Sequence, residues 1–189
     1  MKRIYLSLVA MLVAIAASAQ VYVGGQVGLW RNTDDNHSKF SIAPEVGYNL
    51  SDKWAIGIGI GYAYNYVDGF KTNAFAVSPY ARFTAAKLGP VSFLLDGGFD
   101  FSTVKFKTKK IVGQEFDDSY NAWAIGIKPA VKVNLSKNID FIASLGFLGY
   151  RDYDDTGVEG FDYSSVYGEK GFGFSFSGND LSFGVIYNF

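Results

Sequence analysis

Residues 54–66 decide the fold, and they read Trp-Ala-Ile-Gly-Ile-Gly-Ile-Gly-Tyr-Ala-Tyr-Asn-Tyr. Large apolar or aromatic residues alternate with small ones along the whole stretch. This is the period of a β-strand, whose successive side chains point to opposite faces. The isoleucines lie on one face and the glycines on the other: Ile56, Ile58 and Ile60 against Gly57, Gly59 and Gly61. The strand therefore has one bulky apolar face and one nearly bare face.

The bare face indicates which side of the strand meets solvent. In a water-soluble barrel or sandwich, the outward face carries charged and polar side chains because water solvates them. The small face of residues 54–66 carries no charge. Small residues suit the narrow lumen of a barrel of about eight strands, so we expect the large apolar face to contact lipid.

The same alternation recurs through the rest of the chain. It predicts eight strands, at residues 21–31, 38–49, 54–67, 73–84, 91–105, 119–135, 139–151 and 171–189. Their connections alternate between tight turns and longer polar loops, the long ones at 107–118 and 152–170. An even strand number with this alternation is typical of bacterial outer-membrane barrels. We therefore predict an all-β fold, an eight-stranded antiparallel up-and-down transmembrane β-barrel.

The last predicted strand leaves two alternatives open. Its large residues change phase between Phe176 and Leu181. A bulge near Gly178-Asn179 would restore the register, in which case residues 171–177 extend strand eight. Alternatively, residues 171–177 form a separate hairpin, which would give ten strands.

The first residues have the pattern of a secretory signal peptide. Met1-Lys2-Arg3 is basic, an apolar run follows, and a small-residue cleavage site ends at Ala19 before Gln20. The alternative is a membrane anchor, but the apolar run is shorter than the roughly 20 residues that a spanning helix needs. We expect residues 1–19 to be removed and residues 20–189 to form the barrel domain.

Composition excludes several classes of function. The chain has no cysteine and one histidine, which excludes thiol catalysis, disulfides and Cys/His zinc sites. Its net charge of −1 argues against nucleic-acid binding, which needs a basic surface. We expect no metal and no cofactor.

Several elements together resemble the small outer-membrane β-barrel domain family. They are Ser18-Ala19-Gln20, Pro44…Gly47-Tyr48, Pro79…Arg82-Phe83 and the terminal Leu181-Ser182-Phe183-Gly184-Val185-Ile186-Tyr187-Asn188-Phe189. The family includes the porin-like and OmpA/OmpX-type eight-stranded proteins of Gram-negative bacteria. The resemblance implies export to the outer membrane, with lipid and lipopolysaccharide around the barrel. It also implies insertion by the outer-membrane assembly machinery, which reads a C-terminal strand signal, here Phe183, Val185, Tyr187 and Phe189.

Charged residues on the small faces suggest a closed interior. Strand rise places Glu45, Arg82, Asp96 and Lys132 in a similar layer, with Lys128 nearby. Unpaired charges in a narrow, low-dielectric lumen are costly, so we expect them to form a salt-bridge network that plugs the barrel. The alternative is a wet lumen in which they line a thin water path.

The sequence therefore predicts a monomeric, non-enzymatic barrel with a structural or surface-interaction role. The basic start of one long loop, Lys105–Lys110, and the acidic, aromatic Asp152–Asp162 could contact an extracellular ligand. One alternative is a small passive pore. A remote one is a lipid-modifying outer-membrane acyltransferase that uses His37, expected in an external loop beside Asp34, Asp35 and Ser38.

Overall fold

The computed structural model describes residues 20–32, 37–67, 70–111, 114–154, 170–176 and 181–189. The predicted signal peptide, residues 1–19, and the predicted bulge at Gly178-Asn179 lie outside this part. The strands are β1 (Val21–Asn32), β2 (His37–Asn49), β3 (Trp54–Val67), β4 (Phe70–Leu88), β5 (Val91–Ile111), β6 (Gln114–Asn134), β7 (Ile139–Leu145), β8 (Phe147–Tyr153), β9 (Gly171–Ser175) and β10 (Leu181–Asn188).

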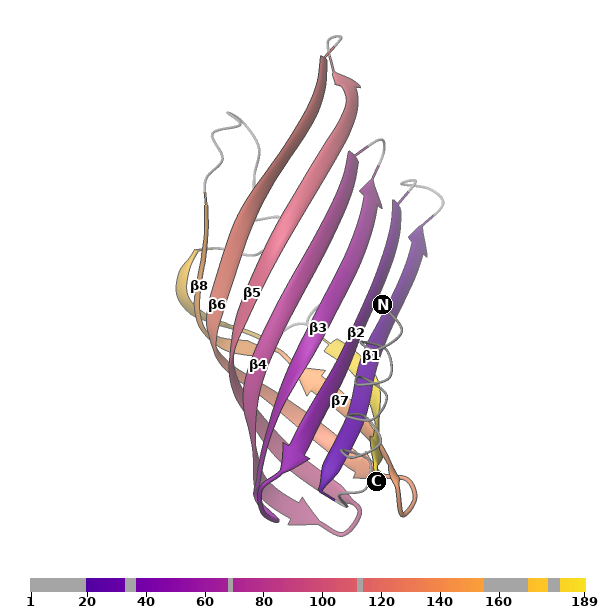
Figure 1. The fold of residues 1–189 in the computed structure, drawn as a ribbon, viewed down its shortest axis with the longest axis vertical. Helices are drawn as coiled ribbons and strands as arrows, with labels where there is room; N and C mark the ends of the chain where they lie inside the picture. Colours follow the sequence, from indigo (N-terminus) through magenta and orange to yellow (C-terminus); the bar gives the residue numbers. More distant parts are fainter. Residues whose placement is uncertain (1–19, 33–36, 68–69, 112–113, 155–169, 177–180) are drawn as a thin grey trace, which may run out of the picture.

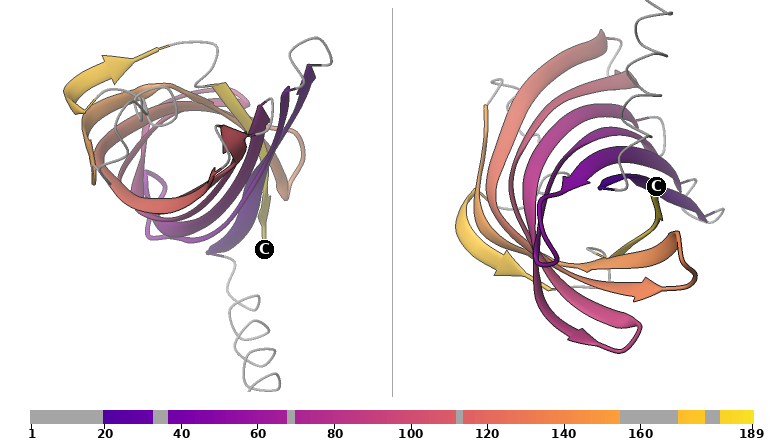
Figure 2. Two further views of the ribbon diagram at one scale, coloured as in Figure 1. Left: turned by 90° about the horizontal axis from the view of Figure 1, so that it is seen from above. Right: turned by 60° about the horizontal axis from the view of Figure 1, so that its bottom comes forward.

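These segments form a closed antiparallel barrel of eight strands (Figures 1 and 2). Strands β1 to β6 each pair with the next, and β10 pairs with both β1 and β7 to close the ring. Strands β7 and β8 both pair with β6 and together form the seventh strand of the barrel. Strand β10 pairs with β7 and β9 pairs with β8, so β9 and β10 together form the eighth. The predicted fold class is confirmed, and residues 171–175 continue the eighth strand beside β8.

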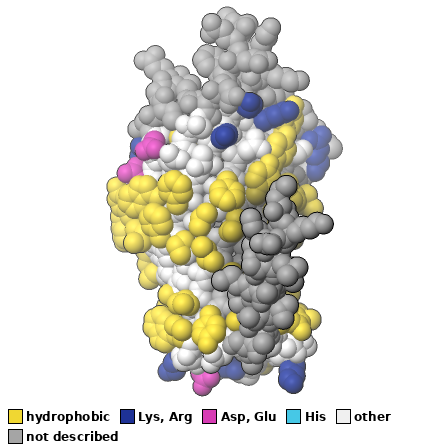
Figure 3. Space-filling view, in the orientation of Figure 1, with side chains coloured by type: hydrophobic (Ala, Val, Ile, Leu, Met, Phe, Trp, Pro, Cys, Tyr) yellow, Lys and Arg dark blue, Asp and Glu magenta, His cyan; other side chains and the backbone are white. Residues whose placement is uncertain are grey.

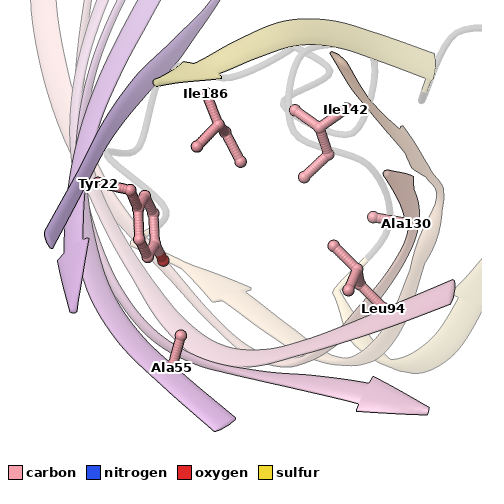
Figure 4. Close-up of a cluster of buried hydrophobic side chains, with 6 residues drawn as sticks. All are labelled: Tyr22, Ala55, Leu94, Ala130, Ile142 and Ile186. Carbon is pink, nitrogen blue, oxygen red and sulfur yellow. The ribbon is translucent and has the colours of Figure 1, made fainter. Parts of the chain in front are cut away.

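The two faces of β3 lie as predicted. Ile56, Ile58 and Ile60 point outward and are 48%, 40% and 47% exposed. Ala55, on the opposite phase, is buried and points into the barrel (Figure 4). A band of exposed apolar side chains surrounds the molecule, as Figure 3 shows for one face. The exterior is therefore built to contact lipid.

A bulge explains the irregular alternation of the seventh strand. Register pairs Ala130 with Ser144 but Ile127 with Leu148, so the seventh strand carries one extra residue here. Gly146 sits at the break between β7 and β8 with a φ of +88°, a left-handed conformation that favours glycine. The buried phase changes from even-numbered residues in β7 to odd-numbered residues in β8.

The prediction of a long loop at residues 107–118 is wrong. β5 continues to Ile111 and β6 begins at Gln114, so the connection is a strand hairpin that rises beyond its neighbours (Figure 1). Beyond the lipid band, the outer face meets water, so Lys105 and Lys107 can take the outward positions without ending the strand. The predicted loop at 152–170 falls mostly on residues 155–169, outside the described part.

Three turns gather at one end of the barrel, which we call the short-turn end, while the long hairpins of β3 with β4 and of β5 with β6 extend at the other. The turns at residues 50–53, 89–90 and 135–138 lie at this end, together with the start of β1 and the end of β10. Gly89 takes a φ of +60° in the shortest of them. Outer-membrane barrels place short turns in the periplasm and long hairpins outside. In the described residues, no helix is both long and apolar enough to cross a bilayer.

Candidate functional site

An arginine inside the barrel lies between two carboxylates. Arg82, on β4, stands in register with Asp96 on β5 and makes a bidentate pair with it, with both N–O distances 2.8 Å. Arg82 Nη2 also lies 3.5 Å from Glu45 Oε2, which comes from β2 across β3. The side chains of Arg82, Glu45 and Asp96 are 9%, 14% and 13% exposed. The structure thus brings together three of the residues proposed for the interior network.

Two tyrosines complete this cluster. The Tyr80 hydroxyl donates to Glu45 Oε2 at 2.7 Å, and the Tyr22 and Tyr80 hydroxyl oxygens are 2.8 Å apart. The Arg82 guanidinium carbon lies 4.9 Å from the centre of the Tyr80 ring and 5.7 Å from that of Tyr22, within cation–π range. Hydrogen-bonded groups of this kind strengthen one another in a low-dielectric interior. We call these five residues, Tyr22, Glu45, Tyr80, Arg82 and Asp96, the Arg82 cluster.

Glycines make room for the tyrosine rings. A Cβ on Gly57 would lie 2.6 Å from Tyr80 Cζ, and one on Gly47 would overlap the Tyr22 ring. Gly59 and Gly61 leave more room, since the nearest atoms to an added Cβ are 3.8 Å and 3.5 Å away. The bare face of β3 lies between Glu45 and Arg82, and the Tyr80 ring occupies the space that Gly57 leaves there.

An apolar ring surrounds the lumen at the level of the Arg82 cluster. It consists of Tyr22, Ala55, Leu94, Ala130, Ile142 and Ile186, all buried and pointing inward (Figure 4). Ala55 is in register with Arg82, and Leu94 precedes Asp96 by two residues on the same face of β5. These side chains narrow the lumen with apolar surface, and they lower the local dielectric around the ion pairs.

The two predicted lysines form separate ion pairs. Lys128 Nζ lies 2.7 Å from Asp100, and the Lys128 side chain is 42% exposed. Lys132 Nζ lies 3.1 Å from Asp140 near the short-turn end. The structure therefore does not bring Lys128 and Lys132 into one network with Arg82.

Asp140 links three strands at the short-turn end. Its carboxylate accepts hydrogen bonds from Asn134 Nδ2 on β6 and Asn188 Nδ2 on β10, at 2.9 and 3.0 Å, besides pairing with Lys132. The residue is 2% exposed. A polar cavity of about 330 Å³ lies beside it, lined by Asn49, Lys87, Gly89, Pro90, Ser92, Lys132, Asn134, Asp140 and Asn188.

Sequence reasoning missed four interior residues that make polar contacts, Tyr22, Tyr80, Asp100 and Asp140. Tyr80 and Asp100 had a usable signal, because each is a large or charged residue on an otherwise small, inward phase. Asp140 had none, because the bulge at Gly146 obscures the phase of its strand.

The residues of the acyltransferase alternative do not converge. His37 is the first residue of β2, and its Nε2 lies 2.7 Å from Asn65 Oδ1. Ser38 Oγ accepts a hydrogen bond from Arg31. As neighbours on a strand, His37 and Ser38 point to opposite faces. Asp34 and Asp35 lie outside the described residues.

Where side chains are described, no three of His, Asp and Glu gather in a group that could hold a metal ion.

The C-terminal residues form an apolar stripe on the outer face of β10. Phe183, Val185 and Tyr187 alternate with inward-facing residues and are exposed, as is Phe189 beyond the strand. The Tyr187 and Phe189 rings meet edge to face, with centroids 5.1 Å apart.

Two solved structures resemble the chain over nearly its full length. The N-terminal β-barrel domain of Pseudomonas aeruginosa OprF is 15% identical, with a TM-score of 0.52, and the match covers 91% of this chain and 98% of that one. A major outer membrane protein from Thermus thermophilus is 14% identical, with a TM-score of 0.51 and coverages of 90% and 98%. No protein-family model and no curated protein matches the sequence. At these identities, the likeness shows the fold.

Proposed function

Because the chain has the fold of the small eight-stranded outer-membrane β-barrels, we propose that it is a structural or surface-interaction barrel whose lumen is closed to solutes. Its mature form is residues 20–189, and it works as a monomer in the outer membrane. The observation that carries the proposal is the Arg82 cluster, in which one buried guanidinium pairs with carboxylates from two other strands.

The proposed closure rests on two features at one level of the barrel. The Arg82 cluster draws side chains from β1, β2, β4 and β5 toward the axis. The apolar ring adds Leu94, Ile142 and Ile186 from β5, β7 and β10. An ion crossing this level would have to separate buried ion pairs and pass apolar side chains, both of which cost free energy.

Planar-bilayer conductance tests the closed lumen directly. The wild-type barrel is expected to show no steady single-channel conductance. Arg82→Ala removes the side chain that joins Glu45 to Asp96 and is expected to produce measurable, cation-favouring openings, because it leaves two acidic groups facing the lumen.

Lys128→Ala is the matched control. It also removes one lumenal cation, but one that is 42% exposed and paired outside the Arg82 cluster. It should leave the barrel closed. Steady, ion-selective openings in the wild type would overturn the closed lumen and favour the small passive pore.

The proposed contact surface for an extracellular partner is the hairpin of β5 and β6. It extends farther from the short-turn end than its neighbours (Figure 1). Replacing residues 109–115 by a two-residue Asn-Gly turn shortens the hairpin symmetrically, because Thr108 and Phe116 are register partners. This change should abolish binding to a host or bacterial surface without affecting barrel assembly. Unchanged adhesion of cells that display the shortened barrel would contradict this role.

For assembly, we propose that Phe183, Val185, Tyr187 and Phe189 are the signal read by the outer-membrane assembly machinery. Their support is the exposed, every-second-residue spacing on β10. We propose no catalytic role for His37, whose ring nitrogen is engaged by Asn65.

A further inference from the structure

Lysines gather on the outer wall of the barrel above its apolar band. Figure 3 shows Lys and Arg side chains over the hydrophobic surface of one face. Lys71 on β4 and Lys105 and Lys107 on β5 are exposed and occupy the outward phase of their strands. Register pairs Lys71 directly with Lys107, and pairs Lys105 with Asn73, two residues from Lys71.

This arrangement concentrates positive charge. Side chains that face each other on one side of an antiparallel pair have Cβ atoms about 5 Å apart, and like charges there destabilise the sheet. On their other sides, Lys71 faces Tyr66 of β3 and Lys105 faces Ser119 of β6, neither of which is acidic. Lys71 and Lys105 are diagonal neighbours on this face, and an anion from outside the protein would lower the repulsion between their ammonium groups.

Lys107 has a different neighbour. Across the β5–β6 ladder it is in register with Asp117. A bound anion would therefore be held mainly by Lys71 and Lys105, while Lys107 adds positive charge beside them.

The wall below the lysines is layered. A polar layer comes first, in which the Tyr62 hydroxyl donates to Asn73 Oδ1 and the Thr103 hydroxyl donates to Asn121 Oδ1, both at 2.9 Å. Next along the same outward phases come the exposed rings of Phe75 and Phe101. Moving away from the short-turn end, the wall thus presents apolar rings, then amides and hydroxyls, then ammonium groups.

We propose that Lys71, Lys105 and Lys107 bind the phosphate of an outer-leaflet glycolipid whose acyl chains lie along Phe75 and Phe101. The order of the layers matches such a lipid from chain to headgroup, and lysine is a good donor to phosphate as a point charge. The inference rests on the proposed outer-membrane location and orientation, since it needs this end of the barrel to face the outer leaflet.

Binding to defined lipids in detergent micelles tests the site. The probes are lipid A carrying its phosphates and the same glycolipid after dephosphorylation. The full barrel should prefer the phosphorylated probe, and the double variant Lys71→Gln/Lys105→Gln should bind it about tenfold more weakly or worse. The control, Lys53→Gln/Lys87→Gln, removes two exposed lysines at the opposite end and should bind like the wild type.

Three results would overturn the proposal: equal binding of the dephosphorylated probe, unchanged affinity in the Lys71/Lys105 variant, or displacement of the lipid by an equal concentration of inorganic phosphate. Heat-modifiable gel migration checks that each variant is folded, and each single lysine variant provides a second test. The same gel assay on the wild type shows whether the proposed barrel forms at all. A wild type that folds but does not bind lipid therefore counts against the lysine site and not against the proposed function.

Discussion

Tyr80 occupies the space that Gly57 leaves open. The two residues are register partners on β4 and β3, and the ring carbon Cζ of Tyr80 would be only 2.6 Å from a Cβ on Gly57. The absence of a side chain at position 57 therefore lets Tyr80 reach Glu45.

Gly57→Ala should weaken the barrel by displacing this ring. An added methyl in a packed interior costs about 1–3 kcal/mol, and the Tyr80–Glu45 hydrogen bond should be lost with it. Gly59→Ala is the control on the same face, since the nearest atom to its new Cβ is 3.8 Å away. Urea unfolding of the barrel in lipid vesicles would measure both. Equal stability of the two variants would contradict the packing argument.

Arg82→Gln should be strongly destabilising. The substitution leaves Glu45 and Asp96 buried without their cation, and breaking a buried pair from one side costs about 3–5 kcal/mol. Lys128→Gln should cost about 1 kcal/mol or less, because its ion pair is partly solvated. The same unfolding measurement compares them, and a smaller loss at Arg82 than at Lys128 would show that the Arg82 cluster does not hold the strands together.

Alanine substitutions at three glycines can distinguish backbone strain from steric overlap as causes of destabilisation. Gly146 has a positive φ, and an added Cβ there would overlap the carbonyl oxygen of Ser175; Gly171 has a φ of +110° with open space around it; Gly173 has neither constraint. Substitution to alanine should therefore destabilise in the order 146, 171, 173. Strain alone accounts for about 1–3 kcal/mol. A thermal melt followed by gel migration would rank them, and a Gly173 variant as unstable as the Gly146 variant would contradict this reading of the bulge.

Alternation in residues 54–66 was enough to predict both the barrel and its outward face, because side-chain period and burial coincide there. The same reasoning selected Glu45, Arg82 and Asp96, since a charge on a small, inward phase needs a partner. It could not assign partners to Lys128 and Lys132. Strand register gives a residue's height in the barrel, but the direction of a long side chain depends on its neighbours.

Local irregularity limited the remaining predictions. The one-residue bulge opposite Pro129 reverses the phase at Gly146, so inward and outward positions cannot be read continuously across it. At residues 107–118, polar composition suggested a loop, yet in the structure the pairing of β5 with β6 continues through most of this stretch. The polar residues of this stretch reflect contact of the hairpin with water, and they do not mark the end of β5 or the start of β6.

Ile58→Arg tests the lipid-facing band. An arginine on the lipid face near the bilayer midplane costs about 2–4 kcal/mol, while the cost near an interface is about 0–1 kcal/mol. Leu135→Arg, in a short turn at the barrel end, should therefore be tolerated. Unfolding in vesicles is the measurement. If Ile58→Arg proved harmless in vesicles, residue 58 could not lie against acyl chains.

Phe189→Ala should separate folding from delivery. Refolding of the purified chain into detergent is expected to proceed nearly as in the wild type, because Phe189 lies beyond the end of β10 and is exposed. The amount in the outer membrane of living cells should fall several-fold, since the proposed assembly signal would lose its last residue. Membrane fractionation measures the second quantity. Leu135→Ala, an exposed apolar residue outside β10, is the control, and equal membrane levels of both variants would argue against the signal.

The environment of Asp140 has a consequence for the order of biogenesis. One of its donors is Asn188 on β10, which follows the other barrel strands in the chain and must fit between β7 and β1. An intermediate lacking that strand would lack one of the two amide donors that this carboxylate has in the closed barrel. Joining the two ends of the sheet therefore supplies electrostatic stabilisation in addition to ladder bonds, and incomplete cylinders should be too short-lived to accumulate.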